Sequence, residues 1–303
     1  MHRSKVSEFI ENKFQGHDIE VLGGGHHSQA YKFETEDNTL VLRISPKKDH
    51  FLRDKFIADR WPDLLVPKVV ETSRFEGGGY YAVSEYVEGN VLASGWEFNP
   101  ELNPKDVKDS FVEALVNIAK TDVSSTSGYG KILDDGRGEF DSWQDFLMAV
   151  FESGTGANIK IKRQVEEGLY DSKLLEQAEA ATRKLLADTS TYETKHLLHG
   201  DFQPHNVIVK EKDVVAVLDW GNAKYGDFAY DIMWCVMHGP EVASLKEIKS
   251  TYKRSGLDTT EIHTRLKLAE ISILISWAMF SNEIGNYDNA KSDQARLNDL
   301  LAS

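Results

Sequence analysis

The chain has 303 residues, of which 41% are hydrophobic and 10% aromatic, as expected for a folded globular protein. This length exceeds one typical domain and favours two lobes. With 49 acidic and 35 basic residues, the net charge of −14 argues against nucleic acid and anionic membranes as partners and favours polycationic small molecules. An acidic surface that serves only solubility is the alternative, and charge alone does not separate the two.

Cysteine content and hydropathy indicate the cellular compartment. The single cysteine, Cys235, lies in an apolar segment, where a small core residue explains it better than a nucleophile does. The N-terminal residues lack the apolar core of a signal peptide, and the longest apolar run, residues 271–280, is too short to cross a bilayer. We therefore expect a soluble, cytoplasmic protein, and a monomer.

The first part of the chain predicts a short helix followed by an antiparallel sheet. Apolar residues at helical spacing predict a helix over residues 4–14. Val21-Leu22 begin a strand that the glycines at 23–25 interrupt. Apolar residues that alternate with polar ones predict two further strands, around residues 31–33 and 40–44.

Four residues in this part suit a nucleotide. The glycine turn that contains Gly25, with the hydroxyl of Ser28, can bring donors close to phosphate oxygens, although plain hairpin loops use glycine triplets more often. Arg43 is a cation on the neighbouring strand that can neutralise phosphates, and an exposed strand charge explains it equally well. Asp54, in a helix predicted over residues 50–60, can pair with Arg43; an exposed aspartate is the alternative.

A boundary follows the next predicted strand, residues 80–87, because the pattern beyond it is mainly helical. We expect residues 1–88 to form a nucleotide-binding lobe and residues 89–303 a catalytic and substrate-binding lobe. A connector between lobes commonly lines a cleft, so its backbone is expected to hydrogen-bond an adenine. The connector residues are Glu85, Tyr86 and Val87.

Beyond the boundary, helical periodicity alternates with loops. Residues 122–140, which include four glycines, are expected to be a loop. Ser172 is expected to cap the helix that starts at residue 173. The helices are expected over residues 104–118, 142–151, 173–187, 261–280 and 288–301.

The most informative stretch spans residues 196–231. It contains Asp201 in a His-Gly-Asp sequence, then Asn206 five residues later and Asp219 thirteen residues after that. Two apolar runs between the last two, joined by a polar turn, predict an antiparallel hairpin. Because a hairpin returns the chain to its starting point, Asn206 and Asp219 should meet at one end of it, with Asp201 a short loop away.

Two carboxylates and an amide oxygen on one small patch suit a hard cation such as Mg²⁺. Phosphoryl transfer needs this division of roles: one carboxylate orients and deprotonates a hydroxyl, while an asparagine and a second aspartate hold metal against the nucleotide. Each residue alone is better explained as an ordinary polar residue at the end of a hairpin. Their order and spacing together favour the catalytic interpretation.

Asp231, the last residue of this stretch, begins a strongly apolar helix. We expect its carboxylate to accept hydrogen bonds from backbone N–H groups of the loop that carries Asp201. A helix-start aspartate favoured only by the helix dipole is the alternative.

These motifs together resemble the aminoglycoside phosphotransferase family, and the likeness extends over nearly the whole chain. The shorter features are similar to the subgroup that phosphorylates hygromycin B. The motifs that carry the family resemblance are His199-Gly200-Asp201 with Asn206, Leu218-Asp219-Trp220, and Gly226-Asp227 with Asp231; those of the subgroup are Val41–Ile44, Thr126–Gly130, Trp143 with Asp145-Phe146, and Gly285–Asp288. The resemblance implies an α+β, protein-kinase-like fold of two lobes, with a small antiparallel N-terminal sheet and a mainly helical C-terminal lobe.

The resemblance also implies roles. Asp201 becomes the base for the acceptor hydroxyl, Asn206 and Asp219 bind Mg²⁺, and Arg43 replaces the usual kinase lysine. The chain would then transfer the γ-phosphoryl group of ATP, or of GTP, to a hydroxyl of a polycationic aminoglycoside or aminocyclitol, a reaction of antibiotic resistance.

Two rivals and one detail of substrate binding stay open. A kinase of the same fold that acts on a sugar, choline or homoserine would carry the same catalytic residues. A non-catalytic pseudokinase is suggested by Arg43 and by the incomplete glycine motif, but the intact catalytic set argues against it. Glu283 and Asp288 can receive the substrate's ammonium groups, although a solvated helix-and-loop face explains each slightly better.

Overall fold

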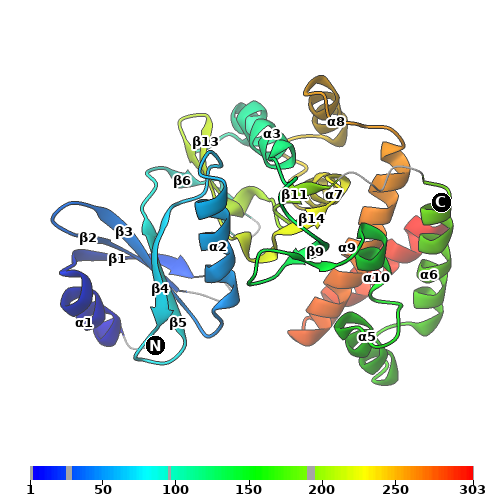
Figure 1. The fold of residues 1–303 in the computed structure, drawn as a ribbon, viewed down its shortest axis with the longest axis horizontal. Coiled ribbons are helices and arrows are strands. Elements are labelled where there is room, and N and C mark those ends of the chain that lie inside the picture. Colours follow the sequence, from blue (N-terminus) through cyan, green and yellow to red (C-terminus); the bar gives the residue numbers. More distant parts are fainter. Residues whose placement is uncertain (1–2, 25–28, 95–96, 190–194, 303) are drawn as a thin grey trace. The chain divides into compact units, whose positions relative to one another are not determined.

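The computed structural model describes residues 3–24, 29–94, 97–189 and 195–302, and the chain divides into two compact units (Figure 1). Unit 1 comprises Met1–Asn117, Asp134–Gly136 and Gln203–Ala223. Unit 2 comprises Ile118–Leu133, Arg137–Phe202 and Lys224–Ser303. This division follows local packing, and the predicted lobes, residues 1–88 and 89–303, stay a prediction.

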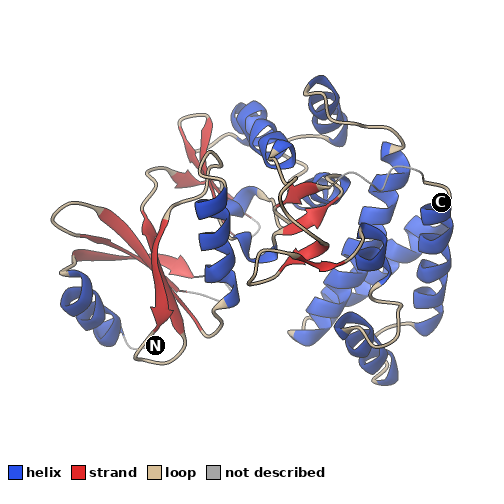
Figure 2. Ribbon diagram, viewed as in Figure 1, coloured by secondary structure: helices blue, strands red, loops and turns tan. Residues whose placement is uncertain are grey.

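Unit 1 contains a five-stranded antiparallel sheet in the order β1-β2-β3-β5-β4 (Figure 2). Helices α1, Arg3–Phe14, and α2, Asp49–Arg60, cover its opposite faces. The strands are β1 His17–Gly24, β2 Gln29–Glu34, β3 Thr39–Ser45, β4 Val69–Arg74 and β5 Tyr80–Glu85. The first strand is longer than predicted, because it begins at His17 and pairs with β2 as far as Gly24.

Alternation along the strands decides which side chains meet which helix. On β3, Leu42 belongs to the core cluster that α1 completes with Val6 and Ile10. Ala82 of β5 packs on the other face with Phe51 of α2. Arg43, between two core residues of β3, lies on the α2 face, with its guanidinium 5.2 Å from the ring centroid of Phe51. Arg43 therefore lies on the face of β3 opposite the core cluster that contains Leu42.

The predicted hairpin is confirmed in unit 1. Strands β12, Val207–Lys210, and β13, Asp213–Val217, pair antiparallel, and β6, Asn90–Val91, adds a third strand beside β12. Glu211 has φ 59° in the tight turn between them. Two short 3₁₀ turns flank the hairpin, η1 Pro204–Asn206 and η2 Trp220–Asn222. A two-stranded ribbon of β7 Ala93–Ser94 and β8 Glu97–Phe98 completes the strands of this unit.

Unit 2 contains a four-stranded sheet in the order β10-β9-β14-β11. The strands are β9 Tyr129–Ile132, β10 Gly138–Phe140, β11 His196–Leu198 and β14 Lys224–Gly226. The prediction that residues 122–140 form only a loop is therefore wrong. Strand β9, within these residues, pairs with β14, which comes much later in the chain. Local sequence patterns do not indicate which distant segments will pair.

Helices form the rest of unit 2, and a cluster of buried apolar residues from several of them forms its core. Two of these helices, α5 and α8, were not predicted. The predicted cap of α6 is wrong, because Asp171 rather than Ser172 caps this helix by accepting from two backbone N–H groups. The helices are α4 Trp143–Met148, α5 Gly156–Glu166, α6 Ser172–Ala187, α7 Ala229–His238, α8 Leu245–Arg254, α9 Ile262–Glu283 and α10 Tyr287–Ala302, while α3, Pro104–Lys120, begins in unit 1. In the described ranges, no helix is both long and apolar enough to cross a membrane.

Candidate active site

The loop that carries Asp201 follows β11 in unit 2. The carboxylate of Asp231, in the first turn of α7, accepts hydrogen bonds from the backbone N–H groups of His199, at 2.6 Å, and Gly200, at 2.8 Å. The backbone N–H of Asp201 in turn donates to Nδ1 of the buried His199 at 3.2 Å. The predicted role of Asp231 is confirmed, and the result is a fixed loop that presents a half-buried Asp201 side chain.

Burial sets the electrostatics of this loop. It raises the pKa of Asp231 to about 6, against the hydrogen bonds from the loop and the charge of Lys224, which both lower it. Lys224 is itself buried, with its Nζ 4.8 Å from the ring centroid of Tyr230. The pKa of the Tyr230 hydroxyl is raised by burial and then by the charges of Asp231 and Asp201, so this ring lies in the field of the proposed base. Sequence reasoning missed both Lys224 and Tyr230.

A second buried carboxylate anchors the start of α7. Asp227 accepts two hydrogen bonds from the guanidinium of Arg265 on α9, at 2.7 Å and 2.5 Å. Both side chains are almost fully buried, and Asp227 also accepts from the backbone N–H of Ala229 at 2.9 Å. This fork-to-fork pair ties the loop before α7 to the long helix α9.

In unit 1, the hairpin brings Asn206 and Asp219 to the same end. Val207 pairs with Val217, and the backbone N–H of Leu218 donates to the carbonyl of Asn206 at 2.7 Å. The predicted meeting of the two residues at one end of the hairpin is confirmed. Asp219 has φ 60° and ψ 66°, a left-handed conformation that costs about 1 kcal/mol for most residues and is often retained where a site requires it.

Asp54 connects Arg43 to the residue after Asp219. Its Oδ2 accepts from Nη2 of Arg43 at 2.5 Å, and its Oδ1 accepts from the backbone N–H of Trp220 at 2.9 Å. The predicted pairing of Asp54 with Arg43 is confirmed. Burial raises the pKa of Asp54, Arg43 opposes that rise, and the nearby charge of Asp219 adds to it.

The turn after Asp219 packs tightly against α2. Nε of the buried Arg53 donates to the carbonyl of Gly221 at 2.7 Å. A Cβ atom on Gly221 would lie 2.0 Å from Nδ1 of His50, so any larger residue there would require the His50 ring to move. Nδ1 of His50 also lies 3.4 Å from Oδ1 of Asp219.

The oxygen atoms of Asn206 and Asp219 fit a small hard cation. The Asp219 carboxylate is 49% exposed and can reach a ligand, whereas Asn206 is buried and fixed by the hairpin. The described part of the chain contains no cluster of three or more histidine, cysteine or acidic side chains that could enclose an ion. Two such oxygen donors leave room for phosphate and water, with which Mg²⁺ fills its coordination in nucleotide sites.

The sequence matches the phosphotransferase enzyme family over residues 18–261, which is most of the chain. The chain belongs to this family. It is 25% identical to hygromycin-B 4-O-kinase of Escherichia coli over 99% of this chain and 85% of that protein. It is also 24% identical to an aminoglycoside 3'-phosphotransferase of Enterococcus faecalis over 69% of this chain and 75% of that protein.

Solved structures confirm the predicted protein-kinase-like fold. The crystal structure of aminoglycoside phosphotransferase APH(4)-Ia superposes with a TM-score of 0.83 and 25% identity, and 99% of each chain is covered. A thermostable mutant of that enzyme, in ternary complex with AMP-PNP and hygromycin B, superposes with a TM-score of 0.82 and 25% identity, over 99% of this chain and 98% of that one. The predicted family and the predicted phosphotransferase class are both confirmed.

The connector of this phosphotransferase is only partly available to an adenine. The backbone N–H of Glu85 donates to the carbonyl of Lys68, and that of Tyr86 donates to the carbonyl of Thr39, each at 3.0 Å. An adenine would therefore bind through carbonyl groups of this segment or through Val87. The roles of Glu85, Tyr86 and Val87 stay predictions.

Four further residues were predicted to bind nucleotide or substrate: Gly25, Ser28, Glu283 and Asp288. Gly25 and Ser28 fall outside the described residues. Glu283, the last residue of α9, forms an ion pair with Lys160 of α5 at 3.1 Å. Asp288 is exposed in the first turn of α10. Substrate binding by Glu283 and Asp288 therefore stays a prediction.

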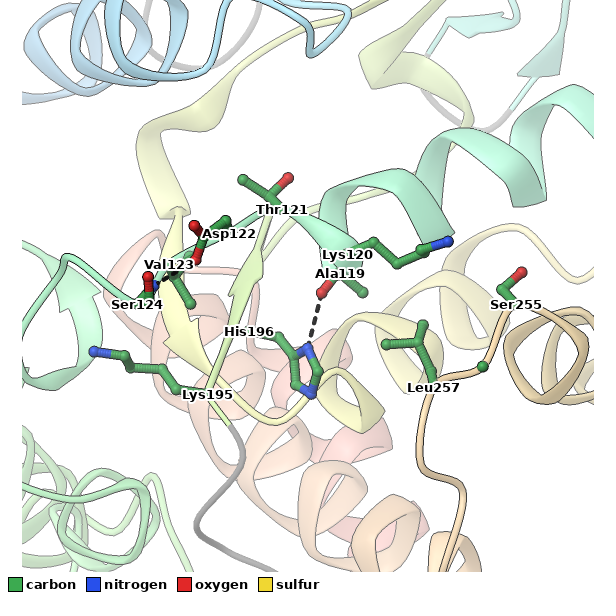
Figure 3. Close-up of a pocket in the computed structure, with 11 residues that line it drawn as sticks. Ala119, Lys120, Thr121, Asp122, Val123, Ser124, Lys195, His196, Ser255 and Leu257 are labelled. Carbon is green, nitrogen blue, oxygen red and sulfur yellow. Dashed lines mark hydrogen bonds between the residues drawn. The ribbon is translucent and has the colours of Figure 1, made fainter.

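A cavity of about 400 Å³ opens beside the start of β11 in unit 2 (Figure 3). Nδ1 of His196 donates to the carbonyl of Ala119 at 2.8 Å, and burial lowers the pKa of this imidazole. Its lining combines the charges of Lys120, Lys195 and Asp122 with apolar side chains. Among the described residues, none of the predicted catalytic side chains lines it, and its mixed charge favours no one class of ligand.

Proposed function

We propose that this phosphotransferase transfers the γ-phosphoryl group of ATP, or of GTP, to a hydroxyl of an aminoglycoside or aminocyclitol such as hygromycin B. The observation that carries the acceptor is the similarity to hygromycin-B 4-O-kinase along 99% of the chain. The net charge of −14 suits a polycationic acceptor. The complexes of APH(4)-Ia with AMP-PNP or ADP support an adenine nucleotide as the donor.

Asp201 orients the acceptor hydroxyl and takes its proton as the new oxygen–phosphorus bond forms. The bond between the γ-phosphorus and the bridging oxygen to the β-phosphate breaks in the same step, and the nucleoside diphosphate leaves. The hydrogen bonds from His199 and Gly200 to Asp231 support this role, because they hold the loop before Asp201 in one conformation. Fixed positioning of the nucleophile accounts for much of the rate in phosphoryl transfer, where the transition state needs little covalent help from the protein.

Asn206 and Asp219 would hold Mg²⁺, which when bound neutralises charge on the nucleotide phosphates. Arg43 supplies a fixed positive charge toward the same phosphates, and its ion pair with the buried Asp54 keeps the guanidinium in place. The guanidinium presents a planar set of donors, whereas a lysine beside the same carboxylate would hold a more compact and more mobile ammonium. A cytoplasmic location, a monomeric state and the absence of nucleic-acid or membrane partners stay predictions from the sequence.

The direct test of this proposal is nucleotide turnover with a panel of acceptors. ADP and GDP release is measured with Mg²⁺ over hygromycin B, other aminoglycosides, neutral sugars and amino alcohols such as choline and homoserine. We expect release stimulated by at least one aminoglycoside and dependent on Mg²⁺. Stimulation by a sugar or amino alcohol alone would overturn the proposed acceptor while leaving the reaction class intact.

The base is tested by Asp201→Ala. Loss of a positioned general base typically lowers a rate by about 10²- to 10⁴-fold, so kcat should fall by that amount. Nucleotide affinity should stay within about twofold, because Asp201 is not among the residues proposed to bind phosphate. Turnover that survives the change would show that another group takes the proton.

A further inference from the structure

Two lysines lie directly opposite each other in the four-stranded sheet of unit 2. Lys131 of β9 pairs with Lys224 of β14 in antiparallel register, next to the pair of Gly130 and Tyr225. Directly opposite residues of an antiparallel pair project from the same face of the sheet, with their Cβ atoms about 5 Å apart. Two like charges at such positions destabilise a sheet. A residue pair that lowers stability in this way is commonly retained for a function.

Burial strengthens the repulsion between these two charges. Lys224 is 8% exposed and Lys131 is partly buried, so water screens neither ammonium fully. The ring of Tyr230, 4.8 Å from Nζ of Lys224, attracts this ammonium but carries no net charge. The nearby Asp231 carboxylate uses both oxygens to accept backbone N–H groups of the loop before Asp201. An oxyanion between the two lysines would relieve the repulsion between them.

The lysine pair lies beside the strand that leads to the proposed base (Figure 1). On its other side, Lys224 pairs with Leu198, the last residue of β11, and Asp201 follows Leu198 by three residues. The first turn of α7, which holds that loop through Asp231, contacts the Lys224 ammonium through the ring of Tyr230. Strand pairing and this ring contact therefore place Lys224 at the base of the loop that carries Asp201.

The chemistry of two adjacent lysines selects an anion. Their ammonium groups are compact point charges that bind phosphate oxygens through charge-assisted hydrogen bonds. The same charges repel the ammonium groups of a polycationic acceptor, so the pair does not serve to bind those groups. Every turnover brings one phosphate anion to Asp201, because the transferred phosphoryl group bonds to the acceptor oxygen there. That group is the oxyanion that suits the lysine pair.

We propose that Lys131 and Lys224 form an oxyanion site that holds the phosphoryl group of the phosphorylated acceptor beside Asp201. The two ammonium groups keep their protons and offset the charge of the phosphate, so the step needs no further reactant. The source of the oxyanion rests on the proposed function. The site itself does not, because inorganic phosphate presents the same tetrahedral oxygens and tests it directly.

Thermal unfolding of the full chain tests the oxyanion site. In phosphate-free buffer at low ionic strength, Lys131→Met should raise the Tm by about 1–3 °C, because it removes the repulsion. Inorganic phosphate should raise the Tm of the wild type by at least about 2 °C more than that of this variant. Sodium chloride at matched ionic strength separates phosphate binding from screening. Lys131→Arg, which keeps the charge, should respond to phosphate as the wild type does.

Calorimetry with the reaction product tests the source of the oxyanion. Hygromycin B and its phosphorylated product, isolated from wild-type turnover, are titrated into each variant. Lys131→Met and Lys224→Met should each weaken product binding at least about fivefold and change the Kd of hygromycin B by less than about twofold. The matched control is Lys184→Met, which removes one charge from the exposed surface of α6 and should change neither Kd.

The possible outcomes separate this inference from the proposed function. If Lys131→Met lowers the Tm and responds to phosphate as the wild type does, the two lysines are only structural and the inference is overturned. A phosphate response that depends on Lys131, with equal product binding in every variant, overturns the assignment to the transferred phosphoryl group. If the wild type phosphorylates no aminoglycoside, the proposed function fails, and the phosphate measurement still decides whether the lysine pair binds an oxyanion.

Discussion

Arg43 and Asp54 illustrate how one buried residue can connect distant parts of a site. Asp54 is 3% exposed, and its two oxygens bind the guanidinium on β3 and the backbone N–H that follows Asp219. A buried carboxylate that loses its cation retains the desolvation cost without the compensating attraction. Arg43, which stands where kinases usually have a lysine, therefore also stabilises the fold of unit 1.

This coupling predicts a non-additive pair of substitutions. Arg43→Met should lower the free energy of unfolding by about 2–3 kcal/mol, somewhat less than the roughly 3–5 kcal/mol for a fully buried pair, because Arg43 is 22% exposed. Adding Asp54→Asn removes the uncompensated charge, so the double variant should be no less stable than Arg43→Met. Urea unfolding midpoints measure both. Additive losses would show that the two side chains do not depend on each other.

At the scale of elements, the loop that carries Asp201 is held by helix α7. Both oxygens of Asp231 on α7 are used by backbone N–H groups at the end of β11. Burial raises the pKa of this carboxyl from 3.8 to about 6. The ionised carboxylate accepts both hydrogen bonds. In the protonated form one oxygen carries a hydrogen and is a weaker acceptor.

Activity and stability should consequently respond to pH in opposite directions. The folded state binds the Asp231 proton more tightly, so this group's contribution to stability is present below pH 3.8 and is lost as pH rises through about 6, a change of roughly 3 kcal/mol. Turnover, which needs the ionised form, should instead fall as pH drops below about 6. We expect Asp231→Asn to lower kcat about tenfold or more and to flatten both profiles. If kcat of that variant still falls below about pH 6 as it does in the wild type, another group causes the fall.

The contact between α2 and the turn η2 gives a second prediction for elements. Gly221→Ala would place a methyl group against His50, so it should lower the free energy of unfolding by about 1–3 kcal/mol and raise the KM for nucleotide. Gly156→Ala, at the first residue of α5, is the matched control, because no heavy atom lies within 4 Å of its new Cβ. That change should stabilise the protein by up to about 1 kcal/mol. Guanidinium unfolding compares the two, and equal effects would contradict the proposed packing.

Over the whole molecule, sequence patterns predicted the structural features that depend on contacts between residues close in sequence. The hairpin between Asn206 and Asp219 was predictable because its two strands are apolar runs that adjoin in sequence and are joined by a polar turn. Strand β9 was not, because it is only four residues long and its partner β14 lies far along the chain. The same limit applies to the site: the Asp201, Asn206 and Asp219 spacing is local, whereas the burial of Lys224 and the partner of Asp227 depend on packing between distant elements.

The charge of the whole chain gives the last prediction, which separates a polycationic acceptor from a neutral one. A net charge of −14 attracts a cation over distances that salt screens, since the Debye length falls from about 10 Å at 0.1 M to about 3 Å at 1 M salt. The KM for an aminoglycoside should therefore rise at least about threefold across that range, while kcat changes little, because screening weakens encounter and binding rather than the transfer step. The KM for the nucleotide, measured over the same range with a saturating acceptor, shows how much of the change comes from nucleotide binding. If salt raises both KM values equally, the acidic surface contributes nothing to the choice of acceptor, and its role is solubility.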